Sequence, residues 1–213
     1  MSTPQQRLLQ LALDYHVLRF GEFTLKSGRQ SPYFFNAGLF NTGNALKVLG
    51  ECYADIIQQE NLPLDMLFGP AYKGIPLVSA AAVALAERGK DYPYAFNRKE
   101  AKDHGEGGVF VGAPIQGNVL LVDDVITAGT AIRESVGLIQ AAGAQVSGIV
   151  VLFDREERMS DAPTSTLNML SSSLNVPVRA LASFSDVLAL IENHIDFADY
   201  MPAMLQYRES YGV

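Results

Sequence analysis

Two adjacent carboxylates, Asp123 and Asp124, are the residues of this sequence whose types and spacing most suggest chemistry. They follow the apolar run 119–122 (Val-Leu-Leu-Val) and precede the small-residue segment 127–130 (Thr-Ala-Gly-Thr). Because successive strand residues point to opposite faces, one carboxylate could accept hydrogen bonds from sugar hydroxyls while the other orients a metal-bound water. The segment after them offers backbone N–H groups, two hydroxyls and a glycine, which suit a phosphate at the start of a helix. The pattern predicts a binding site for a phosphorylated sugar. The alternative is a plain strand, turn and helix with two solvated aspartates.

A second loop of small residues, 69–74 (Gly-Pro-Ala-Tyr-Lys-Gly), follows the apolar strand 66–68 and precedes a long helical pattern. It is expected at the same edge of the sheet as the carboxylates, because open parallel sheets bind ligands at the carboxyl ends of their strands. Small residues with one lysine, Lys73, suit a diphosphate. The loop lacks the spacing of a Walker P-loop and the chain has no G-x-G-x-x-G, which disfavours nucleotide hydrolases and dinucleotide-binding enzymes.

A basic cluster lies between these two loops. Arg98, Lys99 and Lys102 bring three of the sixteen Lys and Arg residues together, and His104 and three glycines follow. This composition predicts a mobile, positively charged loop over 98–108. The net charge of −7 argues against general nucleic-acid binding.

The segments that carry these residues need a sheet to bring the strand ends together. The 213 residues, 48% of them hydrophobic, suit one domain spanning 1–213. Helical and strand patterns alternate, which predicts an α/β fold with a doubly wound, mainly parallel central sheet flanked by helices. The aromatic-rich segment 20–39 is expected to form a hairpin flap in a small N-terminal hood, made mainly by about residues 1–40. The expected helices lie near 4–15, 43–60, 74–88, 130–142, 163–174, 184–193 and 196–209, and the strands near 65–69, 93–97, 118–123, 146–153 and 176–182.

Other features bear on location and on residues outside the site. No segment has the roughly 18 consecutive apolar residues that a membrane-spanning helix needs, and the first residues are amphipathic rather than a signal peptide. The single cysteine, Cys52, cannot form an internal disulfide, so a cytoplasmic location is expected. His16 and His194 are expected to be structural, and the run 156–158 (Glu-Glu-Arg) to be a solvated turn.

The run 119–130 resembles the motif with which type I phosphoribosyltransferases bind phosphoribosyl pyrophosphate (PRPP). In that family the acidic pair holds the ribose hydroxyls, the Thr-Ala-Gly-Thr segment wraps the 5-phosphate, and a second loop takes the pyrophosphate. The second loop often contains a non-proline cis peptide, which the resemblance places near Ala71–Tyr72. The PRPP site implied by the resemblance comprises Tyr72, Lys73, Arg98, Lys99, Lys102, His104, Asp123, Asp124, Val125, Ile126, Thr127, Ala128, Gly129, Thr130 and Ala131.

Three further stretches, 20–36, 97–107 and 153–157, resemble those family members whose acceptor base is orotate. A base with a carboxylate needs a nearby cation, and the guanidinium of Arg155 offers a planar fork that fits a carboxylate or imide edge. Of Phe34 and Phe35, one is expected in the core, because strand neighbours face opposite ways, and the other could stack on a flat ring. The base site implied by the resemblance comprises Lys26, Phe34, Phe35, Thr127 and Arg155.

The resemblance implies transfer of the 5-phosphoribosyl group from PRPP to N1 of orotate, giving orotidine 5′-phosphate and pyrophosphate in pyrimidine biosynthesis. Lys102, Asp123 and Asp124 would be the catalytic residues. Mg²⁺ is the implied cofactor, carried by PRPP without a direct protein ligand and reached through water by Asp123 or Asp124. In the family the loop 98–108 enters the neighbouring subunit's site, which implies a homodimer with shared active sites and no nucleic-acid or membrane partner.

Three alternatives to this activity differ in the sequence signature that each requires. A phosphoribosyltransferase for another base would share the PRPP motif but not the three additional stretches. A PRPP-binding regulator without catalysis would have lost the loop lysines, and Lys99 and Lys102 are both present. A receiver-like phosphoacceptor would carry its acidic pair after the first strand, without the Thr-Ala-Gly-Thr segment.

Overall fold

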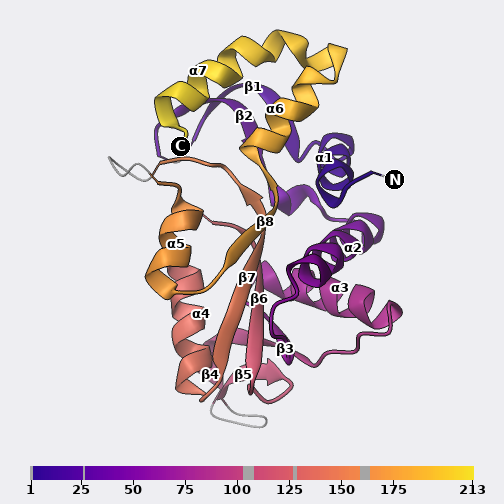
Figure 1. The fold of residues 1–213 in the computed structure, drawn as a ribbon, viewed down its shortest axis with the longest axis vertical. Coiled ribbons are helices and arrows are strands. Elements are labelled where there is room, and N and C mark those ends of the chain that lie inside the picture. Colours follow the sequence, from indigo (N-terminus) through magenta and orange to yellow (C-terminus); the bar gives the residue numbers. More distant parts are fainter. Residues whose placement is uncertain (1, 26, 103–107, 127–128, 159–163) are drawn as a thin grey trace.

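A six-stranded, mostly parallel sheet forms the centre of the molecule (Figure 1). The computed structural model describes residues 2–25, 27–102, 108–126, 129–158 and 164–213. The strand order is β5-β4-β3-β6-β7-β8, and all neighbours are parallel except β4 and β5. The predicted doubly wound α/β architecture is confirmed. The strands are β3 (Met66–Gly69), β4 (Tyr94–Lys102), β5 (Gly108–Gly112), β6 (Asn118–Val125), β7 (Gln145–Asp154) and β8 (Val178–Ser183).

Helices cover both faces of this sheet (Figure 1). Leu120 and Val122 of β6 belong to the core on one face, whereas Val119 and Leu121 belong to the core on the other, and all four are essentially inaccessible to solvent. This double burial explains the uninterrupted apolar run of β6, and each such side chain contributes about 1.5–3 kcal/mol to stability. One face carries α1 (Pro4–Asp14), α2 (Gly43–Glu60) and α3 (Gly74–Glu87), and the other carries α4 (Thr130–Ala141) and α5 (Thr166–Leu174).

The strand order places two distant loops side by side. β3 pairs with β6, with Met66 opposite Val119 and Phe68 opposite Leu121, although β4 and β5 lie between them in sequence. The loop that leaves β3 and the carboxylates that end β6 therefore meet at the same sheet edge. This is the place where open α/β sheets bind their ligands.

A smaller layer lies at one end of the sheet (Figure 1). The antiparallel hairpin of β1 (Leu18–Thr24) and β2 (Gln30–Phe35) packs on elements from the other end of the chain, and the ring of Phe20 lies 5.0 Å from Phe197 and 5.2 Å from Tyr200. We call this layer the hood. Its other elements are the 3₁₀ turn η1 (Ala37–Leu39), α6 (Phe184–Glu192), the 3₁₀ helix η2 (Ile195–Tyr200) and α7 (Met201–Tyr211).

Several elements differ from the sequence expectations. The hood, expected mainly from residues 1–40, also contains α6, η2 and α7. The basic segment expected as a loop from Arg98 continues β4 to Lys102, because it pairs with β5, a strand that the sequence did not predict. The helix expected over 196–209 is divided into η2 and α7 at Met201. Pro202 stands in the first turn of α7, where its missing N–H would have no partner in the helix.

Candidate active site

The carboxylate pair lies at the carboxyl end of β6 and is held from two sides. The side chain of Asp124 is 12% exposed and pairs with the ammonium of Lys73 at 2.5 Å. From α2, the hydroxyl of Tyr53 donates a hydrogen bond to the backbone carbonyl of Asp123 at 2.7 Å. Strand, neighbouring loop and helix thus fix both carboxylates at the sheet edge.

Burial changes the acidity of Asp123. Burial first, and the adjacent charge of Asp124 second, raise the pKa of Asp123 from 3.8 to about 6. The backbone N–H of Asp124 and the ammonium of Lys73 oppose this rise. Ligand hydroxyls that donate hydrogen bonds to the Asp123 carboxylate would replace the water it lost on burial and would favour its charged form. Asp123 is therefore suited to a ligand that donates hydrogen bonds.

We expect Asp123→Asn to stabilise the ligand-free protein at pH 8 but not at pH 4. The folded state raises the pKa of Asp123 above its unfolded value of 3.8, so the free energy of unfolding is highest below that value and falls as pH rises through about 6. The loss amounts to at most about 3 kcal/mol, at 1.36 kcal/mol per pKa unit. Melting temperatures at both pH values test this, with the exposed Asp91→Asn as control. Equal differences from wild type at pH 4 and pH 8 would contradict it.

The loop after β3 is packed so tightly that only glycine fits at its ends. A Cβ on Gly69 would lie 2.3 Å from the carbonyl oxygen of Gly74, and one on Gly74 would lie 2.6 Å from Cδ of Pro70. The Ala71–Tyr72 peptide is cis, as the resemblance predicted, and the N–H of Ala71 donates to the side-chain oxygen of Asn97 at 3.0 Å. The loop has a defined shape and directs Lys73 toward the carboxylate pair.

The start of α4 forms the third wall of the site. Gly129 has φ +73°, a conformation that glycine adopts without strain, and a Cβ there would lie 3.1 Å from Cδ1 of Leu170. Thr130 and Ala131 follow with exposed side chains in the first turn of the helix, whose N–H groups form a ready anion site. Val125 and Ile126 pack instead against the cores. Thr127 and Ala128 lie outside the described residues.

The basic residues of the β4–β5 hairpin flank the same edge. Arg98 donates to the carbonyl oxygen of Gly108 at 3.3 Å, and the ammonium of Lys99 lies 4.9 Å from the centre of the ring of Tyr72, which is 67% exposed. The backbone of Lys102 ends β4. Its side chain and the whole of His104 lie outside the described residues.

Phe34 and Phe35, both expected to contact the acceptor base, point to opposite faces of β2. Phe35 is buried and stacks on Phe153 of β7 at 4.4 Å between ring centres, so it is the core residue of the pair. Phe34 lies on the opposite face of β2, where it stacks on Phe23 at 5.5 Å. The structure therefore does not bring Phe34 together with Arg155, which lies over Tyr33 on the face that Phe35 shares. Lys26 lies outside the described residues.

Arg155 follows β7 and is held by Glu157 and by Tyr207, a residue that the sequence did not single out. Its Nε donates to Glu157 at 2.6 Å, and its Nη2 donates to the hydroxyl of Tyr207 at 3.3 Å. The expectation that Glu157 lies in a solvated turn was wrong: its side chain is 17% exposed and also pairs with Arg29. Tyr207 is about fifty residues away in sequence, so no local pattern could have indicated this contact.

The donor set at the sheet edge fits Mg²⁺ that arrives with a substrate. Within the described ranges, no three or more His, Cys, Asp or Glu residues are grouped so that they could hold a metal. Asp123 and Asp124 offer carboxylate oxygens, but Asp124 already pairs with Lys73. Such a pair suits a cation that keeps its waters and binds mainly through phosphates, rather than one held in a protein cage.

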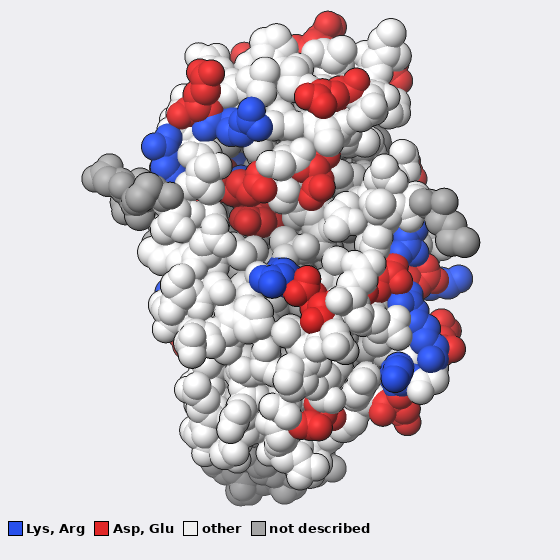
Figure 2. All heavy atoms as spheres, in the orientation of Figure 1, with Lys and Arg blue, Asp and Glu red and all other residues white. Residues whose placement is uncertain are grey.

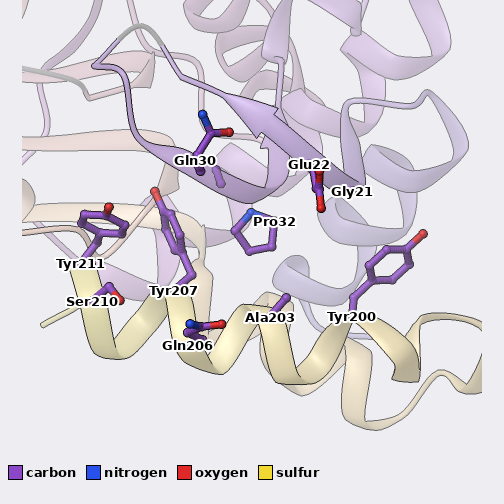
Figure 3. A pocket seen from close by; sticks show the side chains of 11 residues that line it. Gly21, Glu22, Gln30, Pro32, Tyr200, Ala203, Gln206, Tyr207, Ser210 and Tyr211 are labelled. Atoms are coloured by element: carbon purple, nitrogen blue, oxygen red, sulfur yellow. The ribbon is translucent and has the colours of Figure 1, made fainter.

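The hood also contains a pocket of about 690 Å³, between the β1–β2 hairpin and α7 (Figure 3). Its walls include Glu22, Gln30, Pro32, Gln206 and Tyr207, and none of its lining residues belongs to the carboxylate pair or the loop after β3. The chemistry of the sheet edge is therefore not in this pocket.

The surface of the described residues adds two observations. On the face shown in Figure 2, basic and acidic side chains lie beside one another in several places. No helix in the described part of the chain is both long and apolar enough to cross a membrane.

Comparisons with known proteins agree with this geometry. The family model "Phosphoribosyl transferase domain" matches residues 38–178, which include the strands β3 to β7 but exclude the β1–β2 hairpin, nearly all of β8, and α7. An orotate phosphoribosyltransferase of Xanthomonas campestris pv. campestris (strain B100) is 55% identical over all of this chain and 98% of its own. One of Pseudomonas putida (strain W619) is 52% identical over the full length of both chains. The crystal structure of the Francisella tularensis orotate phosphoribosyltransferase superposes with a TM-score of 0.87, at 46% identity, over 96% of this chain and 98% of that one.

Proposed function

The chain belongs to the orotate phosphoribosyltransferase family, and we propose that it transfers the 5-phosphoribosyl group of PRPP to N1 of orotate in pyrimidine biosynthesis. The products are orotidine 5′-phosphate and pyrophosphate. The observation that carries the proposal is the meeting of a carboxylate pair, a tight diphosphate-sized loop and a helix start at neighbouring strand ends. The orotate phosphoribosyltransferases match the full length of the chain, so this similarity also covers the hood, most of which lies outside the general family model.

PRPP would lie along this edge with its three parts on three elements. Asp123 and Asp124 accept hydrogen bonds from the ribose hydroxyls, and the first turn of α4, from Gly129 onward, receives the 5-phosphate. Lys73 and Tyr72 serve the diphosphate. The 2.5 Å ion pair of Lys73 with Asp124 supports this arrangement, because it joins the diphosphate loop to the ribose site.

The transfer forms a bond between N1 of orotate and C1 of the ribose and breaks the bond from C1 to the diphosphate oxygen, which keeps the bonding electrons. N1 of orotate loses its proton readily, so the protein need not supply a strong base. Its task is electrostatic: to stabilise the leaving diphosphate and the positive character at C1. When bound, Mg²⁺ neutralises part of the diphosphate charge. Arg98, Lys99, Lys102 and His104 of the β4–β5 hairpin would add donors to the leaving group and, on closing, exclude water.

The base would be recognised from the hood side. Arg155 offers a charged donor to the carboxylate or imide edge of orotate, and Lys26 and Thr127 complete the polar contacts. Phe35 and Phe153 stack in the core and support this side of the base site from behind. We assign Phe34 a smaller part than Phe35, because it faces away from Arg155.

The oligomer and the location of the enzyme are also proposals. We infer a C2 homodimer in which the segment 98–108 of one subunit completes the site of the other, since the charged hairpin extends from the sheet edge. A cytoplasmic location is consistent with a single cysteine, Cys52, which is buried and reduced.

Orotate should be the base that stabilises the protein against heat. With Mg²⁺ and pyrophosphate present, orotate at a hundred times its Kd should add about 2.7 kcal/mol, which raises Tm by roughly 5–10 °C for a chain of this size. Uracil, adenine and hypoxanthine at the same concentration should shift Tm by less than one degree. Stabilisation by a purine instead would assign another base, and stabilisation by PRPP alone with no effect of any base would favour a PRPP-binding regulator.

A further inference from the structure

Arg155 needs partners of its own if its guanidinium is to meet a base in one orientation. The side chain carries about 2 kcal/mol of rotamer entropy when it is free. In the structure it is 16% exposed, and its guanidinium carbon lies 4.4 Å from the centre of the Tyr33 ring. This contact holds the guanidinium over the ring but does not fix its rotation.

Three hydrogen bonds fix that rotation, the longest of them from Nη2 to the hydroxyl oxygen of Ser31 at 3.5 Å. Nε of Arg155 donates to Oε1 of Glu157 at 2.6 Å, and Nη2 donates to the hydroxyl of Tyr207 at 3.3 Å. The same hydroxyl donates to Oε1 of Glu157 at 2.7 Å, so the three groups close a ring. Nη1 of Arg155 makes no hydrogen bond with any described residue, and it is the nitrogen left for a ligand.

Glu157 is in turn held from two sides: Arg29 donates to its Oε2 at 3.1 Å, and residues 211–213 hold its backbone. The N–H of Arg158 donates to the carbonyl oxygen of Tyr211 at 2.8 Å, and the N–H of Val213 donates to that of Glu156 at 3.1 Å. Between these bonds, Glu157 forms an antiparallel bridge with Gly212. The last residues of the chain therefore hold the backbone of Glu157 in place.

Tyr207 reaches the same point from α7. It points from the helix toward the β1–β2 hairpin (Figure 3), and it is 5% exposed. Burial first, and the hydrogen bond to Glu157 second, raise the pKa of Tyr207. The phenol therefore stays protonated near neutral pH and keeps its hydrogen for Glu157.

We propose that Glu157 and Tyr207 are positioning residues that hold the guanidinium of Arg155 toward the acceptor base, so that the C-terminal helix takes part in base binding. The inference rests on the proposed role of Arg155 in binding orotate. It adds to that role a ring of hydrogen bonds, one member of which, Tyr207, lies in a part of the chain that the general phosphoribosyltransferase model does not cover.

The test compares substitutions that each change one group of the ring. Tyr207→Phe keeps the ring and loses only the hydroxyl, and it should raise KM for orotate about tenfold, the range for a hydrogen bond with a charged group. Glu157→Gln should raise it at least as much. Both should change KM for PRPP and kcat less than twofold. Tyr211→Phe and Glu156→Gln are matched controls: in the described structure the Tyr211 hydroxyl makes no hydrogen bond, and Glu156 bonds to Ser185 instead of Arg155.

Testing Tyr207→Phe in an Arg155→Ala background separates a positioning role from a general effect on folding. Arg155→Ala alone should raise KM for orotate more than KM for PRPP, and adding Tyr207→Phe to it should change nothing further. The same loss from Tyr207→Phe in both backgrounds, or no loss in either, would overturn the proposal while leaving the orotate-binding role of Arg155 intact. An unchanged KM for orotate in Arg155→Ala would overturn that role and the positioning proposal together, whereas orotate turnover by the wild-type enzyme would still stand.

Discussion

Asp123→Asn combined with Asp124→Asn is expected to lower kcat/KM by about 10²- to 10⁴-fold. Each amide keeps the size of the carboxylate but loses a charge-assisted hydrogen bond with a ribose hydroxyl, worth about 1.5–3 kcal/mol. The double substitution also frees Lys73 from its ion pair at the edge of the site. Steady-state kinetics with both substrates varied would measure the loss.

The fold should survive this double substitution. The two carboxylates lie at the end of β6, beyond the buried run that holds the sheet, and Asp123 is destabilising in its ionised form. Circular dichroism and melting should therefore match or exceed wild type, and Asp91→Asn, which is exposed, should retain full activity. A folded double variant with unchanged kcat/KM would show that the carboxylates do not bind the substrate.

Lys102→Ala is expected to lower kcat by about 10²- to 10³-fold. One preorganised donor to a developing charge is typically worth about 2.7–4 kcal/mol. Lys102 ends β4 at the tip of the described hairpin, and Lys90→Ala, outside this hairpin, should have no effect. A pre-steady-state measurement would show whether the loss lies in the transfer step; a loss confined to product release would contradict the role.

Mixed dimers test whether Lys102 acts across the subunit boundary. Lys102→Ala subunits and subunits with both aspartates replaced are each nearly inactive. With random exchange about half the dimers are hybrids, and in a shared-site C2 dimer each hybrid has one intact site, so activity should recover to ~25% of wild type. Mixing Lys90→Ala with the aspartate variant should give ~50% with or without exchange, and it checks that mixing itself does not change activity. Hybrids verified by mass spectrometry but inactive would assign Lys102 to the site of its own subunit.

The sheet and the carboxylate edge were predictable because local pattern and burial agree there. The run from Val119 to Val122 is apolar at every position, which only a strand covered on both faces requires, and the structure buries each of these side chains. The small-residue composition of the loop 69–74 was visible in the sequence, and the structure shows that Gly69 and Gly74 leave no room for a Cβ. The position of the site followed from the rule that ligands bind at the carboxyl ends of parallel strands.

The contacts around Arg155 were not predictable for a physical reason. Tyr207 and Glu157 are fifty positions apart, and nothing in either local pattern specifies which long-range partner fills a buried hydrogen bond. Alternation along β2 showed that Phe34 and Phe35 face opposite ways, but not which of them faces the core. β5 was missed because it pairs only with β4 and its side chains are not fully buried, so it lacks a strong apolar pattern.

Turnover of the purified protein with PRPP, orotate and Mg²⁺ tests the central claim most directly. Orotate, orotidine 5′-phosphate and pyrophosphate would be quantified in the same reaction, with uracil, adenine and hypoxanthine in parallel reactions. We expect one orotidine 5′-phosphate and one pyrophosphate for each orotate consumed, and no product from the other bases. Absence of orotate consumption by folded protein that binds PRPP, or faster turnover of another base, would contradict the claim.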